Sequence, residues 1–133
     1  MSAETALAAA IRAAALGDAG VQQLIGDRFY DDPPPDVVFP YVTIGRVETR
    51  PRDSSEREAL EHATTLHVWS RHGGRGEALD VIAALRGCLH NVALNVADRR
   101  LVLLFAQFTD VFRSGDGRTT HGVLRLRAVT EPE

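Results

Sequence analysis

The side chains best suited to acid–base chemistry or metal binding in this chain are its five histidines. They are His62, His67, His72, His90 and His121. The chain contains no His-x-x-x-His pair and no Cys-x-x-Cys pair, so the spacings that usually hold a metal ion are missing. His67 shares one face of a predicted strand with Trp69. We therefore expect imidazoles that pack against neighbours or face solvent, and no metal site.

The sequence gives equally little support for a catalytic nucleophile or an anion-binding loop. Neither Ser70 nor Ser114 lies in the Gly-x-Ser-x-Gly turn that exposes a serine nucleophile. The single cysteine, Cys88, falls on the apolar side of a predicted helix, which indicates a small core residue. The run Gly73-Gly74-Arg75-Gly76 precedes that helix, but it lacks the Lys-Ser/Thr of a phosphate-binding loop. The sequence predicts no catalytic residue, no metal and no cofactor, and it indicates that the protein is not an enzyme.

Composition places the chain among ordinary globular domains. It has 133 residues, 44% hydrophobic and 25% charged, which predicts a single domain over residues 1–133. The net charge of −3 argues against electrostatic binding of nucleic acid. One cysteine cannot form a disulfide within the chain, which fits a reducing cytoplasm. Glu4 and Arg12 interrupt the alanine-rich start, so we expect an intracellular chain without a signal peptide or membrane span.

The predicted elements are organised around one strand and the helix that follows it. Side chains from Leu60 to Arg71 alternate between two faces, which predicts a strand with one buried face. After the glycines the period changes to about 3.6, which predicts an amphipathic helix from Glu77 to His90. Its apolar stripe is Ala78, Leu79, Val81, Ile82, Leu85, Cys88 and Leu89. A helix that folds back from a strand in this way buries its stripe on the sheet.

The rest of the chain supplies further helices and strands. A helix is predicted from Ala3 to Leu16, ended by Gly17, and a short second helix follows a capping Asp18 and ends at Gly26. Further strands are predicted from Tyr41 to Arg50, Arg100 to Phe112 and Thr119 to Thr130. Phe29-Tyr30 is predicted as a short extended piece, and Pro33-Pro34-Pro35 form the middle of a stiff connector. The order is α-α-β-β-α-β-β. We expect an α+β domain with a mostly antiparallel four-stranded sheet and helices packed on it.

Two strands near the C-terminus carry side chains that bear on assembly. Residues on both faces of Leu101 to Ala106 are apolar, and Phe108 and Phe112 continue one of these faces. Such a strand needs cover on both faces. The predicted central helix covers one, and either the N-terminal helices or a second subunit covers the other. Arg125 and Arg127 share the outward face of the last strand, either as a solvated edge or as a subunit contact.

One continuous segment resembles the signature of a small family of phage proteins. From Leu66 to Ala78 it reads Leu-His-Val-Trp-Ser-Arg-His-Gly-Gly-Arg-Gly-Glu-Ala. The alanine-rich helix, the segment Phe39-Pro40-Tyr41-Val42-Thr43-Ile44-Gly45 and the hairpin from Asp116 to Ala128 resemble the same family in the same order. The chain is similar to the tail terminator proteins of tailed bacteriophages and gene transfer agents, also called tail-completion or head–tail joining proteins. The acidic connector, Asp31-Asp32-Pro33-Pro34-Pro35-Asp36, is its least typical part.

The resemblance implies a structural virion protein that acts by binding. Such proteins form a hexameric ring that caps the finished tail tube and docks onto the stopper and adaptor rings, while DNA passes through the lumen. The implied partners are copies of the chain, the tail tube protein and the stopper, with no membrane and no specific DNA contact. The implied location is the head–tail interface of a particle assembled in the bacterial cytoplasm.

Two exposed, charged loops are the expected contacts with the other rings. The first runs from Arg50 to Glu58, and the second runs from Arg113 to Arg118 around an Asp-Gly turn. The candidate tube or stopper contacts are Arg50, Arg52, Asp53, Glu56, Arg57, Arg113, Asp116 and Arg118. The candidate subunit interface is Phe108, Phe112, Arg125 and Arg127. A ring needs two unlike patches, and the apolar strand and the arginine-bearing strand differ in this way.

Two other functions fit the residues alone. A small dimeric α+β domain that binds a ligand or acts as an enzyme would have a pocket lined by convergent polar groups, with His67 and His121 as candidates. A nucleic-acid module would bind in a salt-dependent manner despite the negative net charge. A dimer in solution would favour the first of these, whereas a hexamer or assembly on a tail tube would favour the terminator.

Overall fold

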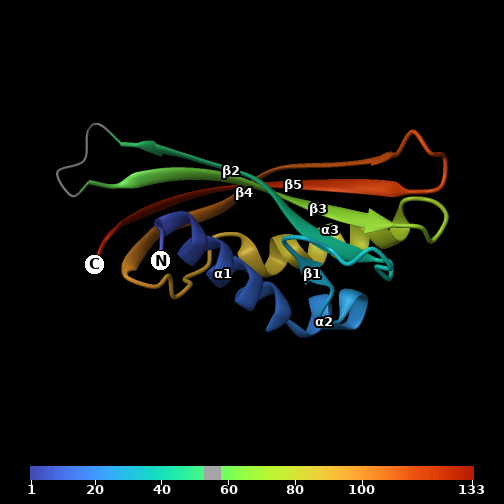
Figure 1. Ribbon diagram of the computed structural model, residues 1–133, viewed down its shortest axis with the longest axis horizontal. Helices are drawn as coiled ribbons and strands as arrows, with labels where there is room; N and C mark the ends of the chain where they lie inside the picture. The colour runs from blue at the N-terminus through green and yellow to red at the C-terminus, as the bar shows by residue number, and fades with distance from the viewer. Residues whose placement is uncertain (53–57) are drawn as a thin grey trace.

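The computed structural model describes residues 1–52 and 58–133, which form one sheet with helices on one of its sides (Figure 1). The helices are α1 (Ala3–Leu16), α2 (Ala19–Ile25) and α3 (Gly76–Leu89). The strands are β1 (Phe29–Tyr30), β2 (Tyr41–Pro51), β3 (Leu60–Ser70), β4 (Arg99–Arg113) and β5 (Thr120–Pro132). The α+β class and the element order are as predicted, but within the described residues the sheet has five strands, not four. The additional strand is the two-residue β1, which is too short to show a periodic pattern and pairs in parallel with β2.

The order of strands in the sheet is β1-β2-β3-β5-β4. β5 pairs antiparallel with β3 on one side and with β4 on the other, so the last strand of the chain is internal. The interpretation of Arg125 and Arg127 as part of a solvated edge is therefore wrong. The edge strand opposite β1 is β4, which is 15 residues long.

The turn from β3 into α3 folds the helix back against the sheet, as predicted. Gly73 and Gly74 have φ angles of 80° and 81°, a conformation that strains residues with a β-carbon. Thr120 Oγ1 donates a hydrogen bond to the carbonyl of Gly74 at 2.9 Å, and Ser70 Oγ donates to Glu77 Oε1 at 2.7 Å. The glycine run therefore forms a tight strand-to-helix turn held by side-chain hydrogen bonds.

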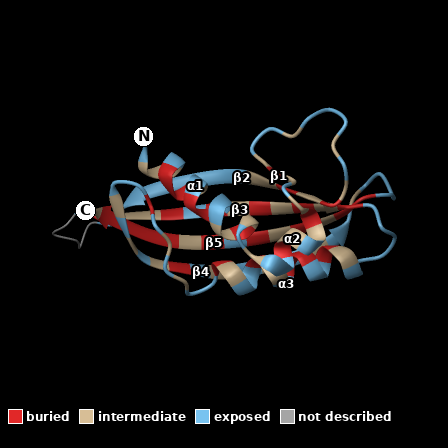
Figure 2. Ribbon diagram, turned by 90° about the horizontal axis from the view of Figure 1, so that it is seen from below, coloured by how far each residue is buried: buried red, intermediate tan, exposed pale blue. Residues whose placement is uncertain are grey.

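The hydrophobic core lies between the helices and the sheet (Figure 2). The residues of α3 that are buried in it are Ala78, Val81, Ile82, Leu85 and Leu89. The predicted stripe is wrong at Leu79, which is half exposed, and Cys88 is only partly buried. At about 100° per residue, Leu79 is turned about 100° from Ala78 and lies outside the buried arc.

The two N-terminal helices lie on the same side of the sheet as α3 (Figure 1). Asp18 Oδ2 accepts a hydrogen bond from the backbone N–H of Val21 at 3.0 Å, which confirms the predicted cap, and Gly17 and Gly26 end the two helices as predicted. α1 buries Leu7 and other side chains of its stripe in the same core as α3. The N-terminal helices therefore do not cover the second face of the apolar strand β4, and one of its two predicted covers is excluded.

The register of β4 decides which of its side chains face the helices. The pairing of β4 with β5 shifts twice, the second time between Ala106 and Phe108. Leu104 faces the helices and is buried, whereas Phe105 faces away from them. Strict alternation would place Phe108 and Phe112 on the face of Leu104, but the bulge moves both to the face of Phe105.

Candidate assembly surface

The sheet face that points away from the helices is uncovered in the described chain (Figure 1). We call it the outer face. Its residues on the three strands β3, β5 and β4 include Glu61, Ala63, Thr65, His67, Trp69, His121, Val123, Arg125, Arg127, Phe105, Phe108 and Phe112. A sheet face left bare by its own helices offers a surface to a partner, so it is the candidate functional surface.

Three phenylalanines of β4 lie on the outer face, and together with the neighbouring arginine of β5 we call them the phenylalanine patch: Phe105, Phe108, Phe112 and Arg125. The three rings are 38%, 44% and 40% exposed. The guanidinium carbon of Arg125 lies 4.6 Å from the centre of the Phe108 ring, within the range of a cation–π interaction. Among the described residues Arg125 forms no ion pair. The patch thus combines apolar surface with the unpaired positive charge of Arg125, and the exposed carboxylate of Asp110 lies between Phe108 and Phe112 on the same face. It brings together three of the four predicted interface residues.

The fourth predicted interface residue, Arg127, has a different environment. Its Nε donates a hydrogen bond to Glu61 Oε1 at 2.9 Å, and its Nη2 contacts the same oxygen. The hydrogen bond from Arg127 is the main cause that holds the pKa of Glu61 below its ordinary value, with smaller contributions from Arg52 and Arg50. Because Glu61 on the neighbouring strand already pairs with Arg127, Arg125 is the arginine that remains for a partner.

A row of rings crosses the outer face at the end near the β4–β5 turn. The ring centres of Tyr41 and Trp69 are 6.3 Å apart, those of Trp69 and His121 are 4.0 Å apart, and those of His121 and Phe112 are 5.0 Å apart. His67 Nδ1 lies 2.8 Å from His121 Nε2, so one imidazole donates a proton and the other accepts it. His67 and His121, the two histidines considered as pocket residues, are therefore in contact. Each already uses one ring nitrogen in the hydrogen bond to the other.

From the histidines of the sheet we expect the folded protein to become less stable in mildly acidic solution. Burial is the main cause that lowers the pKa of His62, His67 and His121, and the charge of His67 lowers that of His121 further. A histidine with a depressed pKa binds fewer protons in the folded than in the unfolded chain. Its contribution to stability is complete above the unfolded pKa of about 6.5 and is lost as the pH falls below that value. We expect the free energy of unfolding to decrease between about pH 7.5 and about pH 5.

Urea titrations followed by the fluorescence of Trp69, the only tryptophan, measure this decrease directly. The double variant His67→Gln with His121→Gln should show a smaller decrease, because two of the titrating groups are gone. A decrease equal to that of the parent protein would contradict the prediction. The lowered pKa values of Glu4 and Glu61 act in a separate window, because their contributions are lost only below the ordinary glutamate pKa of 4.5.

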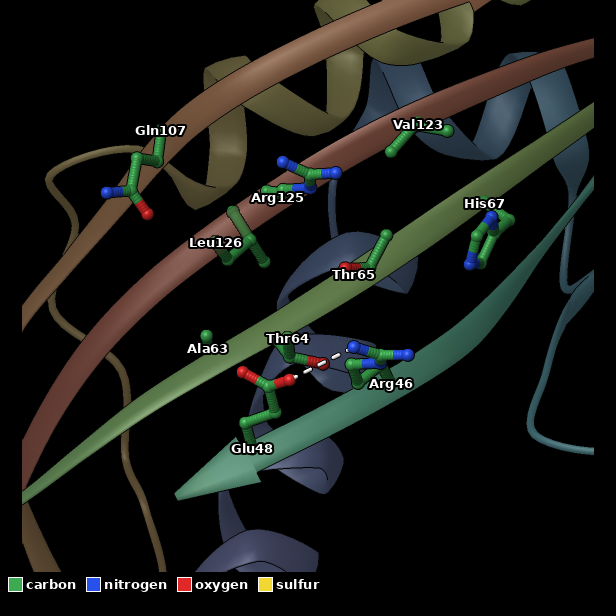
Figure 3. Close-up of a pocket in the computed structure, with 10 residues that line it drawn as sticks. All are labelled: Arg46, Glu48, Ala63, Thr64, Thr65, His67, Gln107, Val123, Arg125 and Leu126. Atoms are coloured by element: carbon green, nitrogen blue, oxygen red, sulfur yellow. Dashed lines mark hydrogen bonds and ion pairs between the residues drawn. The ribbon is translucent and has the colours of Figure 1, made fainter. Parts of the chain in front are cut away.

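A hollow of about 670 Å³ lies on the outer face (Figure 3). Its lining includes the outward residues Thr65 and Val123, with Arg46 from β2 on one side and Arg125 from β5 on the other. Arg46 Nη1 already pairs with Glu48 Oε1 at 3.2 Å. The lining side chains are spread over four strands and do not converge on one point, an arrangement that suits a docked protein segment better than a small ligand.

Two of the predicted contact residues, Asp116 and Arg118, lie in the β4–β5 turn, whereas Arg113, predicted as the start of this loop, is the last residue of β4 and pairs with Thr120. Asp116 Oδ1 accepts hydrogen bonds from the backbone N–H groups of Arg118 and Thr119, each at 2.8 Å, and these bonds lower the pKa of Asp116 to about 2. Arg113 Nη2 donates to the carbonyl of Gly117 at 2.7 Å. Asp116 and Arg113 thus hold the turn together, while the side chain of Arg118 is exposed.

The other predicted contact loop, from Arg50 to Glu58, was predicted to begin too early in the chain. Arg50 and Pro51 belong to β2, where they pair with β3, so the prediction of a loop from Arg50 is wrong for these two residues. Strong β-pairing extends the strand into a charged, exposed sequence. The backbone N–H of Arg52 donates to the carbonyl of Ala59 at 3.0 Å. Asp53, Glu56 and Arg57 lie outside the described residues.

The two hairpin ends lie at opposite ends of the sheet. Pro51 pairs with Leu60 at one end of β3, and Ser70 pairs with Thr120 at the other end. The 11 residues of β3 span about 35 Å at about 3.3 Å per residue. Arg50 and Arg52 are therefore separated from Arg113, Asp116 and Arg118 by about the length of β3.

Sequence reasoning did not single out His62, which is 1% exposed. Its Nδ1 lies 2.9 Å from Thr49 Oγ1 on β2, and its Nε2 lies 2.8 Å from Thr130 Oγ1 on β5. The signal that could have found it is its position in β3, since His62 falls on the same alternating face as Thr64 and Leu66.

The part of the chain that the structure describes offers few other reactive or metal-binding groups. Burial is the main cause that raises the pKa of the Cys88 thiol to about 11, so the reactive thiolate is disfavoured. Within residues 1–52 and 58–133, no group of three or more His, Cys, Asp or Glu side chains could hold a metal ion. In the same residues no helix is both long and apolar enough to cross a membrane.

Comparison with known proteins identifies one family and several solved structures of similar fold. The family model described as tail completion protein gp17 matches residues 9–131. A chain in the virion of a native gene transfer agent (GTA) particle is 24% identical, with a TM-score of 0.90 over 98% of this chain and 98% of that chain. The bacteriophage SPP1 gp17 protein is 22% identical, with a TM-score of 0.61 over 95% of this chain and 89% of that chain. No curated protein sequence matches.

Proposed function

The chain belongs to the tail completion protein gp17 family, and we propose that it is the tail terminator in the virion of a tailed phage or gene transfer agent. In this proposal six copies form a ring that caps the tail tube and docks onto the stopper and adaptor rings, and DNA passes through the lumen. The observation that carries the proposal is the bare outer face with its exposed phenylalanine patch, on a chain that matches the family over residues 9–131. The protein acts by binding and carries out no chemical step.

The proposed subunit contact uses the phenylalanine patch. In a ring, one surface of each copy meets a different surface of the next, so the contact is heterologous. Phe108 and Phe112 supply apolar area, and Arg125 supplies a charge that can be paired. The net charge of −3 suits a lumen through which DNA passes without being held.

The proposed contacts with other rings lie at the two ends of the sheet. Arg50 and Arg52 belong to one end, and Arg113, Asp116 and Arg118 belong to the other. Asp53, Glu56 and Arg57, which the sequence also predicts as contacts, lie outside the described residues. A separation of about 35 Å along the strands allows one end to meet the tail tube while the other meets the stopper or a neighbouring copy.

Reversing two charges tests this assignment. In the variant Arg50→Glu with Arg52→Glu we expect a folded protein that joins tails to heads at least tenfold less efficiently, which corresponds to about 1.4 kcal/mol. Both residues are exposed, and Glu61 opposite Arg50 keeps its pairing with Arg127, so stability should change little. Like charges that face each other across an interface repel strongly. The measurement is the number of joined particles counted by electron microscopy after complementation of a particle that lacks this protein.

The matched control places two glutamates on the helical side of the molecule, Ala83→Glu with Arg86→Glu. Both of these residues are exposed on α3. The control variant should join particles normally. Normal joining by the Arg50→Glu, Arg52→Glu variant as well would remove this end of the sheet from the contacts, and a location of the protein away from the neck would reject the proposed function itself.

A further inference from the structure

The ring requires a second patch that the outer face does not supply. The sequence suggested that the apolar strand and the arginine-bearing strand form two unlike patches. In the structure these strands are β4 and β5, which are neighbours, and Arg125 lies directly over the ring of Phe108. They form one patch. A heterologous contact therefore needs a complementary surface elsewhere on the molecule.

The acidic connector lies at the opposite edge of the sheet from the phenylalanine patch. It joins β1 to β2, and the strand order places β1 and β4 at the two edges. In Figure 2 the loop that leaves β1 projects beyond this edge, away from β4. Two unlike surfaces at opposite edges have the arrangement that allows identical copies to join side by side.

The chemistry of this segment complements the phenylalanine patch. Asp31, Asp32 and Asp36 are exposed, and within the described residues none of them forms an ion pair or a side-chain hydrogen bond. Val38, two residues beyond the connector, is 61% exposed. The segment thus presents carboxylates and an apolar side chain, whereas the phenylalanine patch presents aromatic rings and the unpaired Arg125, with Asp110 between Phe108 and Phe112. Arg125 is therefore the group in the patch that the carboxylates of the segment can pair with.

The connector is held at its end and is stiff in its middle. Arg28 Nε donates a hydrogen bond to the carbonyl of Pro40 at 2.8 Å, and the guanidinium of Arg71 lies 4.4 Å from the centre of the Phe39 ring. Three consecutive prolines restrict the backbone between the aspartates. Stiff proline-rich segments lose little conformational freedom on docking, and aromatic surfaces are their usual receptors.

We propose that the acidic connector and Val38 of one copy dock on the phenylalanine patch of the next copy. The carboxylates pair with Arg125, and Val38 packs against Phe108 and Phe112. Each copy gives one connector and receives one, so the contact repeats around the ring. This inference rests on the proposed ring and names the two surfaces that form its subunit contact.

Crosslinking between copies tests the contact. Val38→Cys and Phe108→Cys are combined in a chain that also carries Cys88→Ala, and the protein is incubated with purified tail tubes and a short bismaleimide. We expect a ladder of covalent oligomers that extends to the full ring, because every subunit contact then brings the thiol at position 38 of one copy to the thiol at position 108 of the next. Each single-cysteine variant should stop at dimers or remain monomeric.

The matched control pairs Phe108→Cys with Leu79→Cys, an exposed residue on α3 outside both surfaces. It should give no ladder. Electron microscopy of the same samples shows independently whether rings form on the tubes. Rings that form without a ladder in the Val38→Cys, Phe108→Cys variant would overturn the contact and leave the proposed function standing, whereas the absence of rings from the parent protein would overturn both.

A charge exchange provides a second measurement that does not depend on cysteine reactivity. Asp32→Arg with Asp36→Arg should reduce ring formation on tubes at least tenfold, and Arg125→Asp alone should also reduce it. Combining all three substitutions restores opposite charges across the contact and should recover ring formation. No recovery in the triple variant, with each protein folded by circular dichroism, would count against the pairing of the connector with Arg125.

Discussion

Replacing Phe108 and Phe112 with aspartate is expected to give a folded monomer that no longer forms rings. Both side chains are about two-fifths exposed, so their loss removes little of the core. At an interface, however, truncation of a central aromatic side chain costs about 2 kcal/mol or more. Six identical contacts multiply the effect to roughly 12 kcal/mol per ring, which is roughly eight to nine orders of magnitude in the assembly constant.

The measurement is the fraction of tail tubes capped by a ring, together with the mass of the free protein by light scattering. The control Leu79→Asp with Ala83→Asp adds the same two charges on the exposed side of α3. It should assemble like the parent protein. Capped tubes at the normal frequency in the Phe108→Asp, Phe112→Asp variant would remove the phenylalanine patch from the subunit interface.

The substitution His62→Ala is expected to lower the free energy of unfolding by about 2–4 kcal/mol. The imidazole is fully buried and bridges Thr49 on β2 to Thr130 on β5, and Thr130 Oγ1 also accepts a hydrogen bond from Arg99 Nε at 2.9 Å. Alanine leaves a cavity and removes one hydrogen-bond partner from each of two threonine hydroxyl groups. Burial lowers the pKa of His62, so the neutral ring is the form that the fold stabilises.

Urea denaturation at neutral pH measures this loss. His72→Ala is the matched control, because His72 is exposed after β3 and its removal should change stability by less than about 0.5 kcal/mol. An unchanged slope of the free energy of unfolding against urea concentration would show that both variants unfold from the same folded state. Equal stabilities of the two variants would mean that the hydrogen bonds of His62 are not structural.

Local chemistry determined the helices, the turns and most strand positions of this protein. Asp18 caps α2, Gly17 and Gly26 end the two N-terminal helices, and the glycines before α3 allow its sharp turn. These features depend on backbone conformation and on hydrogen bonds between residues close in sequence, so they can be predicted from the residues alone. The buried face of β3 was predictable for the same reason, because alternation is a local property.

The tertiary structure alone decided which surface is left for partners. A bulge in β4 moves Phe108 to the outer face, and the pairing of β5 between β3 and β4 places Arg125 over its ring. The packing of α1 and α2 beside α3 leaves that face bare. Strand order, register and the choice of a helical face depend on contacts between residues far apart in sequence. A pattern read along one segment therefore predicts that a residue is apolar or charged, but only the packed sheet decides whether it meets the core or a neighbouring copy.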